Sequence, residues 1–196
     1  MPEAGSDHLY KKVELAGNSI DPFTGGLITI GEPHALIHAG KVFHMSQKIL
    51  TIADAASVDF LIRTPATGYT HVHRMRASTG RGDVDIEAYE APTTTADGTP
   101  ITLDNLNRNS ATLPGTLMFA SPTVTGVGTK IHDLWIPPTA TGTGGTVNGV
   151  SSQEAGEEWI LAPSTDYLQR LTNNSGATIN AWVEIVLYEL NGLVVS

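Results

Sequence analysis

Short runs in which apolar and polar residues alternate follow one another along most of the chain, and clusters of Gly, Pro, Asn, Ser and Thr separate them. Alternation with a period of two is typical of β-strands, and the separating residues are typical of turns. No stretch combines a helical period of apolar residues with capping residues. The pattern predicts an all-β fold with strands at residues 34–47, 48–53, 57–63, 69–78, 83–90, 117–120, 130–136, 158–161, 167–172 and 178–190.

The same alternation assigns side chains to the two faces of a strand. The residues expected to face the core are Val58, Phe60 and Ile62 in strand 57–63, and Val84, Ile86 and Ala88 in strand 83–90. Strand 69–78 is the predicted hairpin partner of strand 83–90, because the residues between them include two glycines, which tight turns favour. The predicted pairs are Met75 with Ile86, Ala77 with Val84, Arg76 with Asp85 and Arg74 with Glu87. A slip by one residue would turn both arginines toward the core, so the register is expected to be well specified.

The last strand, 178–190, is apolar on both faces. One face carries Val183, Ile185 and Leu187, and the other carries Trp182, Val186 and Tyr188. A strand with two apolar faces is usually buried on both sides, and a sandwich of this size offers few places to bury a second face. We therefore predict that the second face contacts another subunit, a setting in which Trp and Tyr are common.

Residues 1–33 differ from the rest of the chain. They are polar and rich in Gly and Pro, apart from an apolar patch at residues 27–30 with Leu27, Ile28 and Ile30. This composition predicts an extended N-terminal arm, followed by a β-sandwich domain over residues 34–196. The apolar patch could add a strand to a sheet edge on a partner protein or a neighbouring subunit.

Long segments rich in Thr, Gly and Pro are predicted as loops at residues 91–100, 105–116 and 137–156. Structureless loops of this length usually bind something or pack on a neighbour. Residues 105–109 are either an Asn-rich loop that satisfies its own backbone or a polar contact with Arg108 as a forked anchor. Trp135, next to the third loop, is a second candidate anchor.

Composition narrows the function classes. The chain has 196 residues, of which 40 % are hydrophobic, so it can form one real core. A net charge of −9 with 11 Lys and Arg argues against binding to nucleic acid or to anionic membranes, since both need clustered cations. The chain has no cysteine, which removes thiolate chemistry and disulfides. The first residues lack the apolar segment of a signal peptide, so synthesis in a cytoplasm is expected.

The histidines are the main candidates for a metal site. His71 and His73 are two residues apart on one strand, and His34, His38 and His44 lie upstream. One interpretation is a Zn²⁺ or Ni²⁺ site, for example on a symmetry axis. The other is that they are partly buried strand residues, which we favour because no acidic ligand stands at a typical spacing.

Other short motifs have simple structural explanations. The tripeptide Arg81-Gly82-Asp83 resembles an integrin-binding sequence, but a tight turn explains it. The acidic residues of strand 83–90 fit a solvated strand face better than a Ca²⁺ site or a glycosidase pair. No phosphate-binding, dinucleotide-binding or Gly-x-Ser-x-Gly motif is present. The residues thus predict no catalytic site, no metal and no cofactor.

Seven short strings occur in a fixed order: IHAG at 37–40, YEAPT at 89–93, ADGT at 96–99, NRNS at 107–110, PTVT at 122–125, EWIL at 158–161 and YLQRLTN at 167–173. Together they resemble a widespread group of small virion proteins of tailed bacteriophages, described as capsid cement or head decoration proteins. The similarity covers residues 34–190, and the arm departs most. The resemblance implies a jelly-roll-like sandwich of about eight strands that associates with itself and binds the major capsid protein on the outside of the head. The apolar second face of strand 178–190 suggests that the homo-oligomer is a trimer.

Two other functions stay open at this point. A receptor- or glycan-binding module of a tail or head-fibre tip is the first alternative, since jelly rolls also host lectins and fold does not fix function. Loop aromatics would favour it, and Trp135 is the one candidate. A cupin-like metalloenzyme that uses the histidines is the second.

Overall fold

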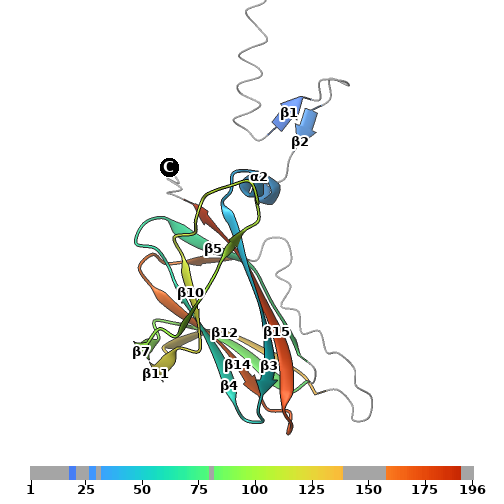
Figure 1. Cartoon of the computed structure of the whole chain (residues 1–196), viewed down its shortest axis with the longest axis vertical. Coiled ribbons are helices and arrows are strands. Elements are labelled where there is room, and N and C mark those ends of the chain that lie inside the picture. The colour runs from blue at the N-terminus through green and yellow to red at the C-terminus, as the bar shows by residue number, and fades with distance from the viewer. Residues whose placement is uncertain (1–17, 21–26, 30–31, 80–81, 139–157, 191–196) are drawn as a thin grey trace, which may run out of the picture.

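The structure, a computed structural model of the chain, describes residues 18–20, 27–29, 32–79, 82–138 and 158–190. Over these ranges the regular secondary structure is almost entirely β-strand, arranged in antiparallel sheets, which confirms the predicted all-β sandwich. The first two strands lie beyond one end of the sandwich (Figure 1). The predicted boundary between an arm of residues 1–33 and a domain of residues 34–196 stays a prediction, since most of the arm lies outside the described residues, as does most of the predicted loop 137–156.

The single helix of the described chain, α2, spans Glu32–His38. The strands are β1 (Asn18–Ile20), β2 (Leu27–Thr29), β3 (Val42–Ile52), β4 (Ser57–Arg63), β5 (Tyr69–Thr79), β6 (Val84–Glu90), β7 (Thr93–Ala96), β8 (Thr99–Ile101), β9 (Asp104–Asn105), β10 (Leu117–Ala120), β11 (Thr123–Gly126), β12 (Thr129–Ile136), β13 (Trp159–Leu161), β14 (Asp166–Asn173) and β15 (Ile179–Leu190).

Eight strands pair in a nested series. β3 pairs with β15, β4 with β14, β5 with β13 and β6 with β12, all antiparallel. The six-stranded sheet has the order β12-β6-β14-β4-β10-β8, and the five-stranded sheet has the order β13-β5-β15-β3-β9. Taken in chain order, these eight strands therefore alternate between the two sheets. The exception is β6 and β12, which follow one another in the series and are neighbours in the six-stranded sheet.

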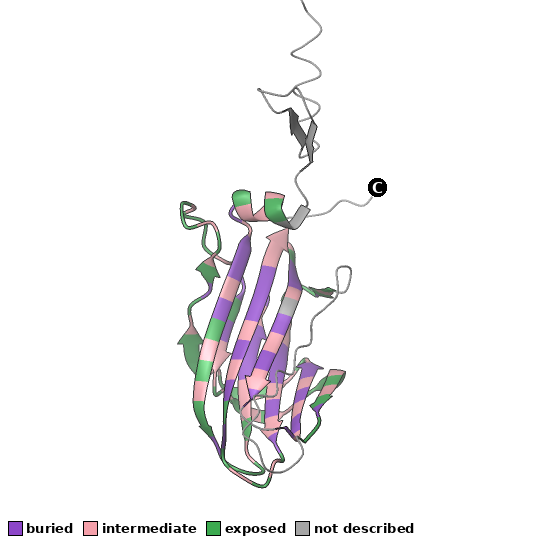
Figure 2. Cartoon of the chain, turned by 90° about the vertical axis from the view of Figure 1, so that its right-hand side faces the viewer, coloured by how far each residue is buried: buried purple, intermediate pink, exposed green. Residues whose placement is uncertain are grey.

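The core lies between the two sheets. Phe60, Ile62, Val84 and Ile86 are buried in it, Ala88 is also buried, and Val58 is partly buried against it, so the predicted core faces are confirmed. Figure 2 shows the resulting alternation of buried and partly exposed positions along the strands. The outer face of the six-stranded sheet also buries side chains: Leu61 and its cross-strand partner Leu168 are fully covered.

The predicted hairpin of strands 69–78 and 83–90 is wrong. β5 pairs with β13 and β15, whereas β6 pairs with β12 and β14, so the two strands belong to different sheets. Met75 and Ala77 do face the core, but Arg76 lies 3.8 Å from Glu184 rather than opposite Asp85. Alternation determines the face of a side chain and says nothing about which strand lies beside it.

The expected strand at 34–47 is in part a helix, and strand 48–53 is not separate. α2 ends at His38, and one long strand, β3, follows. Gly40 has a φ of +67°, and the N–H groups of Gly40 and Lys41 bond to the carbonyls of Ile37 (2.9 Å) and Leu36 (3.0 Å). This is a Schellman helix terminus, which glycine favours because it has no Cβ.

The predicted loops also contain short strands. Within 91–100 lie β7 and the start of β8, and β7 pairs with β11 in a small separate sheet. Residues 89–101 recur as residues 119–131, with the same residue at Pro92 and Pro122, Thr93 and Thr123, Thr95 and Thr125, Gly98 and Gly128, Thr99 and Thr129, and Ile101 and Ile131. The first copy runs from the end of β6 to β8, and the second runs from the end of β10 into β12. Because β6 pairs with β12 and β10 pairs with β8, each copy begins beside the end of the other.

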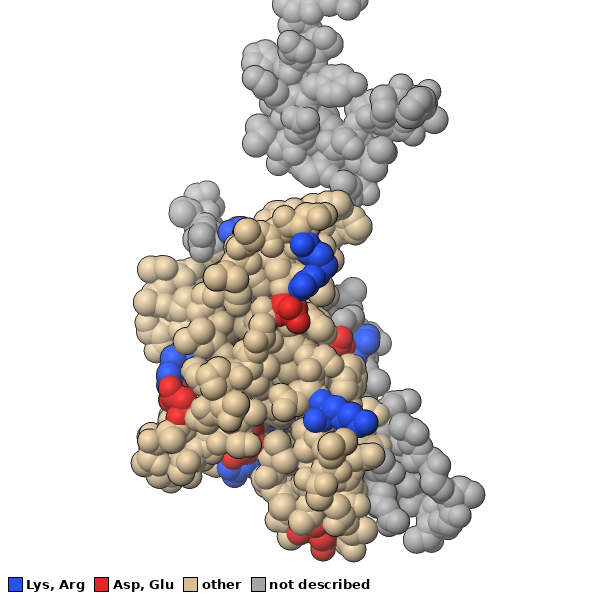
Figure 3. Space-filling view, in the orientation of Figure 1, with Lys and Arg blue, Asp and Glu red and all other residues tan. Residues whose placement is uncertain are grey.

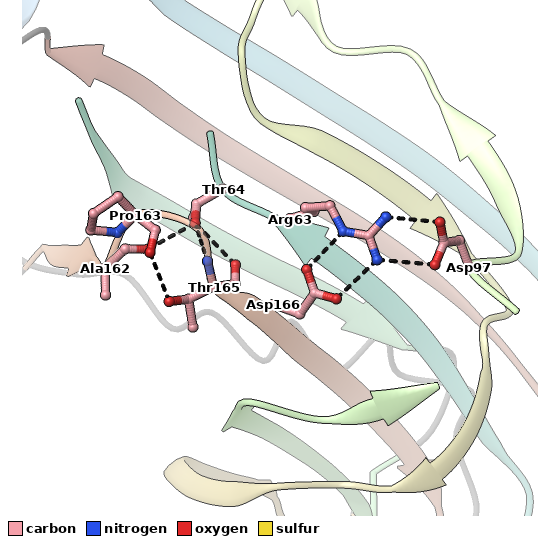
Figure 4. Close-up of polar contacts among 7 residues, drawn as sticks. All are labelled: Arg63, Thr64, Asp97, Ala162, Pro163, Thr165 and Asp166. Atoms are coloured by element: carbon pink, nitrogen blue, oxygen red, sulfur yellow. Dashed lines mark hydrogen bonds and ion pairs between the residues drawn. The ribbon is translucent and has the colours of Figure 1, made fainter. Parts of the chain in front are cut away.

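A forked arginine fixes this part of the chain to the six-stranded sheet. Arg63 donates two hydrogen bonds to Asp166 (both 2.9 Å) and two to Asp97 (2.8 and 3.0 Å), which lies just after β7 (Figure 4). These bonds raise the pKa of Arg63, so its charge is permanent. Beside it, the Thr64 hydroxyl bonds to the Ala162 carbonyl at 2.7 Å and accepts from the Thr165 N–H at 2.9 Å.

Candidate interaction surfaces

The N-terminal arm contains a two-stranded hairpin. β1 and β2 pair antiparallel, with Ser19 opposite Ile28 and Ile20 opposite Leu27. Leu27 and Ile28 lie in a short strand that the sequence analysis did not list, and Ile30 lies outside the described residues. Among the described strands, β1 and β2 pair only with each other, and they stand apart from the sandwich in Figure 1.

Loop 105–116 anchors α2 to the sandwich. Asn105 Nδ2 donates to the Gly40 carbonyl at 3.0 Å, and Asn107 Nδ2 donates to the His38 carbonyl at 2.9 Å. The same two side chains accept backbone N–H groups within the loop. The asparagines therefore have structural roles, which is one of the two interpretations of this Asn-rich segment. Arg108 donates a hydrogen bond from Nη1 to Asp104 Oδ1 at 3.1 Å, and three quarters of its side chain is exposed.

Trp135 lies on β12, the edge strand of the six-stranded sheet. Its ring is 55 % exposed, and its Nε1–H donates to Asp83 Oδ1 at 3.1 Å. A fixed, exposed indole on an edge strand is suited to stacking or packing against a partner. The sequence prediction of Trp135 as an exposed anchor candidate is compatible with this position.

Charged side chains on the outer surface are mostly paired. Arg170 binds Asp59 with two hydrogen bonds of 2.8 and 2.7 Å, and Lys130 contacts Glu87. Figure 3 shows small groups of opposite charge with wide uncharged areas between them. The carboxylates of β6 also have partners: Glu87 contacts Lys130, Asp85 accepts from Asn174 Nδ2 and Glu90 accepts from the Tyr167 hydroxyl.

The outer face of the five-stranded sheet holds Trp182, Val186 and Tyr188. Val186 is 4 % exposed, whereas Trp182 and Tyr188 are partly exposed. Trp182 Nε1–H donates to Ser46 Oγ at 2.7 Å, and Tyr188 OH donates to Glu158 Oε2 at 2.5 Å. Both side chains therefore have their polar atoms satisfied, and both are partly exposed on this face.

Tyr188 belongs to a polar cluster that sequence reasoning missed. The buried His71 ring stacks on Tyr188 at 4.5 Å between centroids, and its Nδ1 lies 3.1 Å from Glu158 Oε1. Burial raises the pKa of Glu158, but hydrogen bonds from Tyr188 and His71 outweigh it, so the pKa lies below the ordinary value. Glu158 is distant from both partners in sequence, and no local signal marks it.

This cluster makes stability depend on pH. Because the pKa of Glu158 is lower in the folded chain than its ordinary value of 4.5, its contribution is complete above that pH and is lost as the pH falls toward the folded pKa. We expect Glu158→Gln to narrow the difference between the urea midpoints measured at about pH 7 and about pH 3.5. An unchanged difference would show that the cluster has no linkage to folding.

The histidines do not assemble into one centre. Among the residues that the structure describes, no three His, Asp or Glu side chains gather in a way that could hold a metal ion. His34 and His38 face each other on α2, with 2.9 Å between Nε2 atoms, and His44 lies 3.8 Å from Glu184.

The described chain also has no helix long and apolar enough to span a membrane.

Exposed leucines form a surface that the sequence analysis did not identify. Leu113 is 83 % and Leu117 is 50 % exposed, and both line a groove of about 270 Å³ beside β8 and β10. Leu113 sits in a Thr- and Pro-rich loop with no periodic pattern, so alternation could not assign its exposure.

Compared with known proteins, the chain matches no family model and no curated protein.

Proposed function

We propose that the chain is a capsid decoration (cement) protein of a tailed bacteriophage, which binds the outer surface of the assembled head and stabilises the junctions between capsomers. Two features support this: the seven strings that resemble such proteins, and an all-β sandwich of the class that the resemblance implies. We propose a binding role without catalysis, metal or cofactor, located on the virion.

The observation that carries the proposal is the β1–β2 hairpin. Its strands have three residues each, and within the described chain neither pairs with a third strand. An isolated two-stranded hairpin is at best marginally stable in water. Such a segment gains stability by adding to a sheet edge of the capsid protein or by packing on a neighbouring copy, and either contact would help to hold the domain on the lattice.

We further propose that the sandwich is a jelly roll. The support is its nested pairing, which gives two four-stranded sets, β12-β6-β14-β4 and β13-β5-β15-β3. A jelly roll consists of eight strands in two sheets connected as Greek keys. β10 and β8 extend the first set, and β9 extends the second.

In the proposed mechanism many copies act together on one lattice. Each copy binds only the mature lattice and therefore stabilises it by mass action. Because a head offers many equivalent junctions, individually modest contacts suffice. Arg108 and Trp135 are candidate anchors to the major capsid protein, and the outer surfaces of Trp182 and Tyr188 are candidates for self-association, most simply as a homotrimer.

Deleting residues 2–30 is expected to weaken binding to undecorated capsids about a hundred-fold or more, since the arm supplies a separate contact. The measurement is co-sedimentation with capsids, with circular dichroism to confirm the fold. Deleting residues 2–17 is the matched control, because it keeps β1 and β2 and should bind normally. If the variant that lacks residues 2–30 still binds capsids fully, the arm does not contribute to capsid binding.

Cryo-electron microscopy of the parent virion tests the location. Density for this chain over capsomer junctions is the expected result. Density confined to a tail or fibre would favour the alternative, a receptor- or glycan-binding module, for which the exposed ring of Trp135 is the one supporting observation. Absence from the particle would overturn both.

A further inference from the structure

A rigid apolar groove lies on the side of the sandwich, where β10 meets the segments that follow β8 and precede β10. Its lining includes Leu103, Leu113, Leu117 and Met118 and contains no charged residue. Met118 and Leu103 form its buried floor, with 1 % and 7 % of their surface exposed. Leu113 and Leu117 stand exposed at its rim, so the groove leaves apolar surface in water.

The wall of the groove is fixed by hydrogen bonds to the opposite sheet. Glu189 of β15 accepts the N–H groups of Gly115 and Thr116 at 2.9 and 2.6 Å. The Thr116 side chain is fully buried and its hydroxyl bonds to the Thr70 hydroxyl at 2.7 Å. The exposure of Leu113 and Leu117 therefore does not result from a loose loop, and the groove is formed before any partner binds.

The hairpin of the arm has the complementary chemistry. Residues 18–30 contain Ile20, Phe23, Leu27, Ile28 and Ile30 and a single charge, that of Asp21. An uncharged groove fits an aliphatic segment of this kind and excludes charged ones. Within the described chain, β1 and β2 pair only with each other, and the groove leaves Leu113 and Leu117 exposed.

The hairpin of one copy is directed away from its own sandwich. Residues 30 and 31 alone separate β2 from α2, and Asn105 and Asn107 hold the end of α2 on the sandwich. In Figure 1 the hairpin lies beyond α2, on the side away from the sheets. A groove on a neighbouring molecule is thus the natural place for it.

We propose that this groove is the docking site for the β1–β2 hairpin of a second copy of the chain, so that copies associate by exchanging arms. The contact joins two different surfaces, and it closes into a ring if the rotation between copies permits. A closed trimer would satisfy every arm and every groove. This inference concerns self-association and does not depend on the capsid role, so its test contains no capsid.

The chain has no cysteine, which permits a direct test by cross-linking. A variant with Ile28→Cys is mixed with a differently sized variant with Leu117→Cys, and the mixture is oxidised and separated without reductant. The control pairs Ile28→Cys with Leu50→Cys, since Leu50 is 71 % exposed on β3, away from the groove. We expect about ten-fold more mixed dimer from the groove pair, because only docking between copies brings these cysteines together. Equal yields from the two pairs would overturn the proposal.

Sedimentation of purified protein gives an independent readout. The unmodified chain is expected to be oligomeric at micromolar concentration and the double variant Leu113→Asp/Leu117→Asp monomeric, with unchanged circular dichroism because both side chains are exposed. Leu50→Asp should leave the oligomer intact. A monomeric unmodified chain, or a double variant that still assembles, would contradict arm exchange.

Discussion

Replacing Asn173 by alanine is expected to lower the free energy of unfolding by about 3 kcal/mol. The side chain is fully buried. Its Nδ2 donates to the carbonyls of Ile52 and Ala53, both at 3.0 Å, and of Ala177 at 2.7 Å, and its Oδ1 accepts the N–H of Ser175 at 3.0 Å. Alanine would remove these four hydrogen bonds from a buried site, and an unsatisfied buried group costs about 1–3 kcal/mol.

The neighbouring Asn174 provides the matched control. It is exposed, and its side-chain Nδ2 donates to Asp85 Oδ2 at 2.8 Å. Asn174→Ala should therefore cost less than about 1 kcal/mol. Urea unfolding followed by tryptophan fluorescence measures both variants under the same conditions. If the two midpoints agree, Asn173 does not join the turns at this end of the sandwich.

The role of Asn173 also illustrates what the sequence leaves out. In sequence it stands at the end of a strand beside Asn174 and Ser175, a context typical of an exposed turn. Its burial arises because the end of β3, more than a hundred residues earlier, closes over it. Contacts of this range are decided by topology, and a local pattern carries no information about them.

The strands themselves are predictable where alternation is strict. Residues 57–63 and 117–120 form β4 and β10 with the expected bounds. Which strands pair with each other is harder to predict, because a strand with one core-facing side shows the same alternation whichever strand lies beside it. The predicted hairpin failed for this reason: its glycine-containing connection leads from one sheet to the other, although the core faces of both strands were assigned correctly.

The missed helix had local signals that the alternation concealed. Pro33 stands in the first turn of α2 and Gly40 just beyond its end, positions that both residues favour in helices. The segment has only two turns, too short for an apolar period to stand out, and its histidines also fit a strand. The candidate surfaces divide similarly. Arg108 and Trp135 could be identified from residue type, whereas the groove at Leu113 depends on how residues 100–103 pack beside residues 113–119.

Substituting Gly128 by alanine is expected to cost about 4 kcal/mol, the largest loss that we predict. Gly128 has a φ of +85°, and a Cβ there would lie 2.1 Å from the Glu90 carbonyl oxygen, so backbone must move. Its counterpart in the repeated motif, Gly98, has a φ of +94° and would meet the Ala120 carbonyl oxygen at 2.2 Å. Each glycine thus lets one copy of the motif lie against the backbone of the other, which interlocks β6, β8, β10 and β12 in one sheet.

The control for this loss is Gly176→Ala. Gly176 has a φ of +73° but nothing within 4 Å of an added Cβ, so only the cost of the left-handed backbone applies, about 1 kcal/mol. Thermal and urea unfolding should show that Gly98→Ala and Gly128→Ala lose similar amounts of stability, and that both are much less stable than Gly176→Ala. Equal losses at all three positions would mean that backbone conformation alone matters. A loss at Gly128 without one at Gly98 would show that the two copies of the motif, although repeated in sequence, do not support the sheet equally.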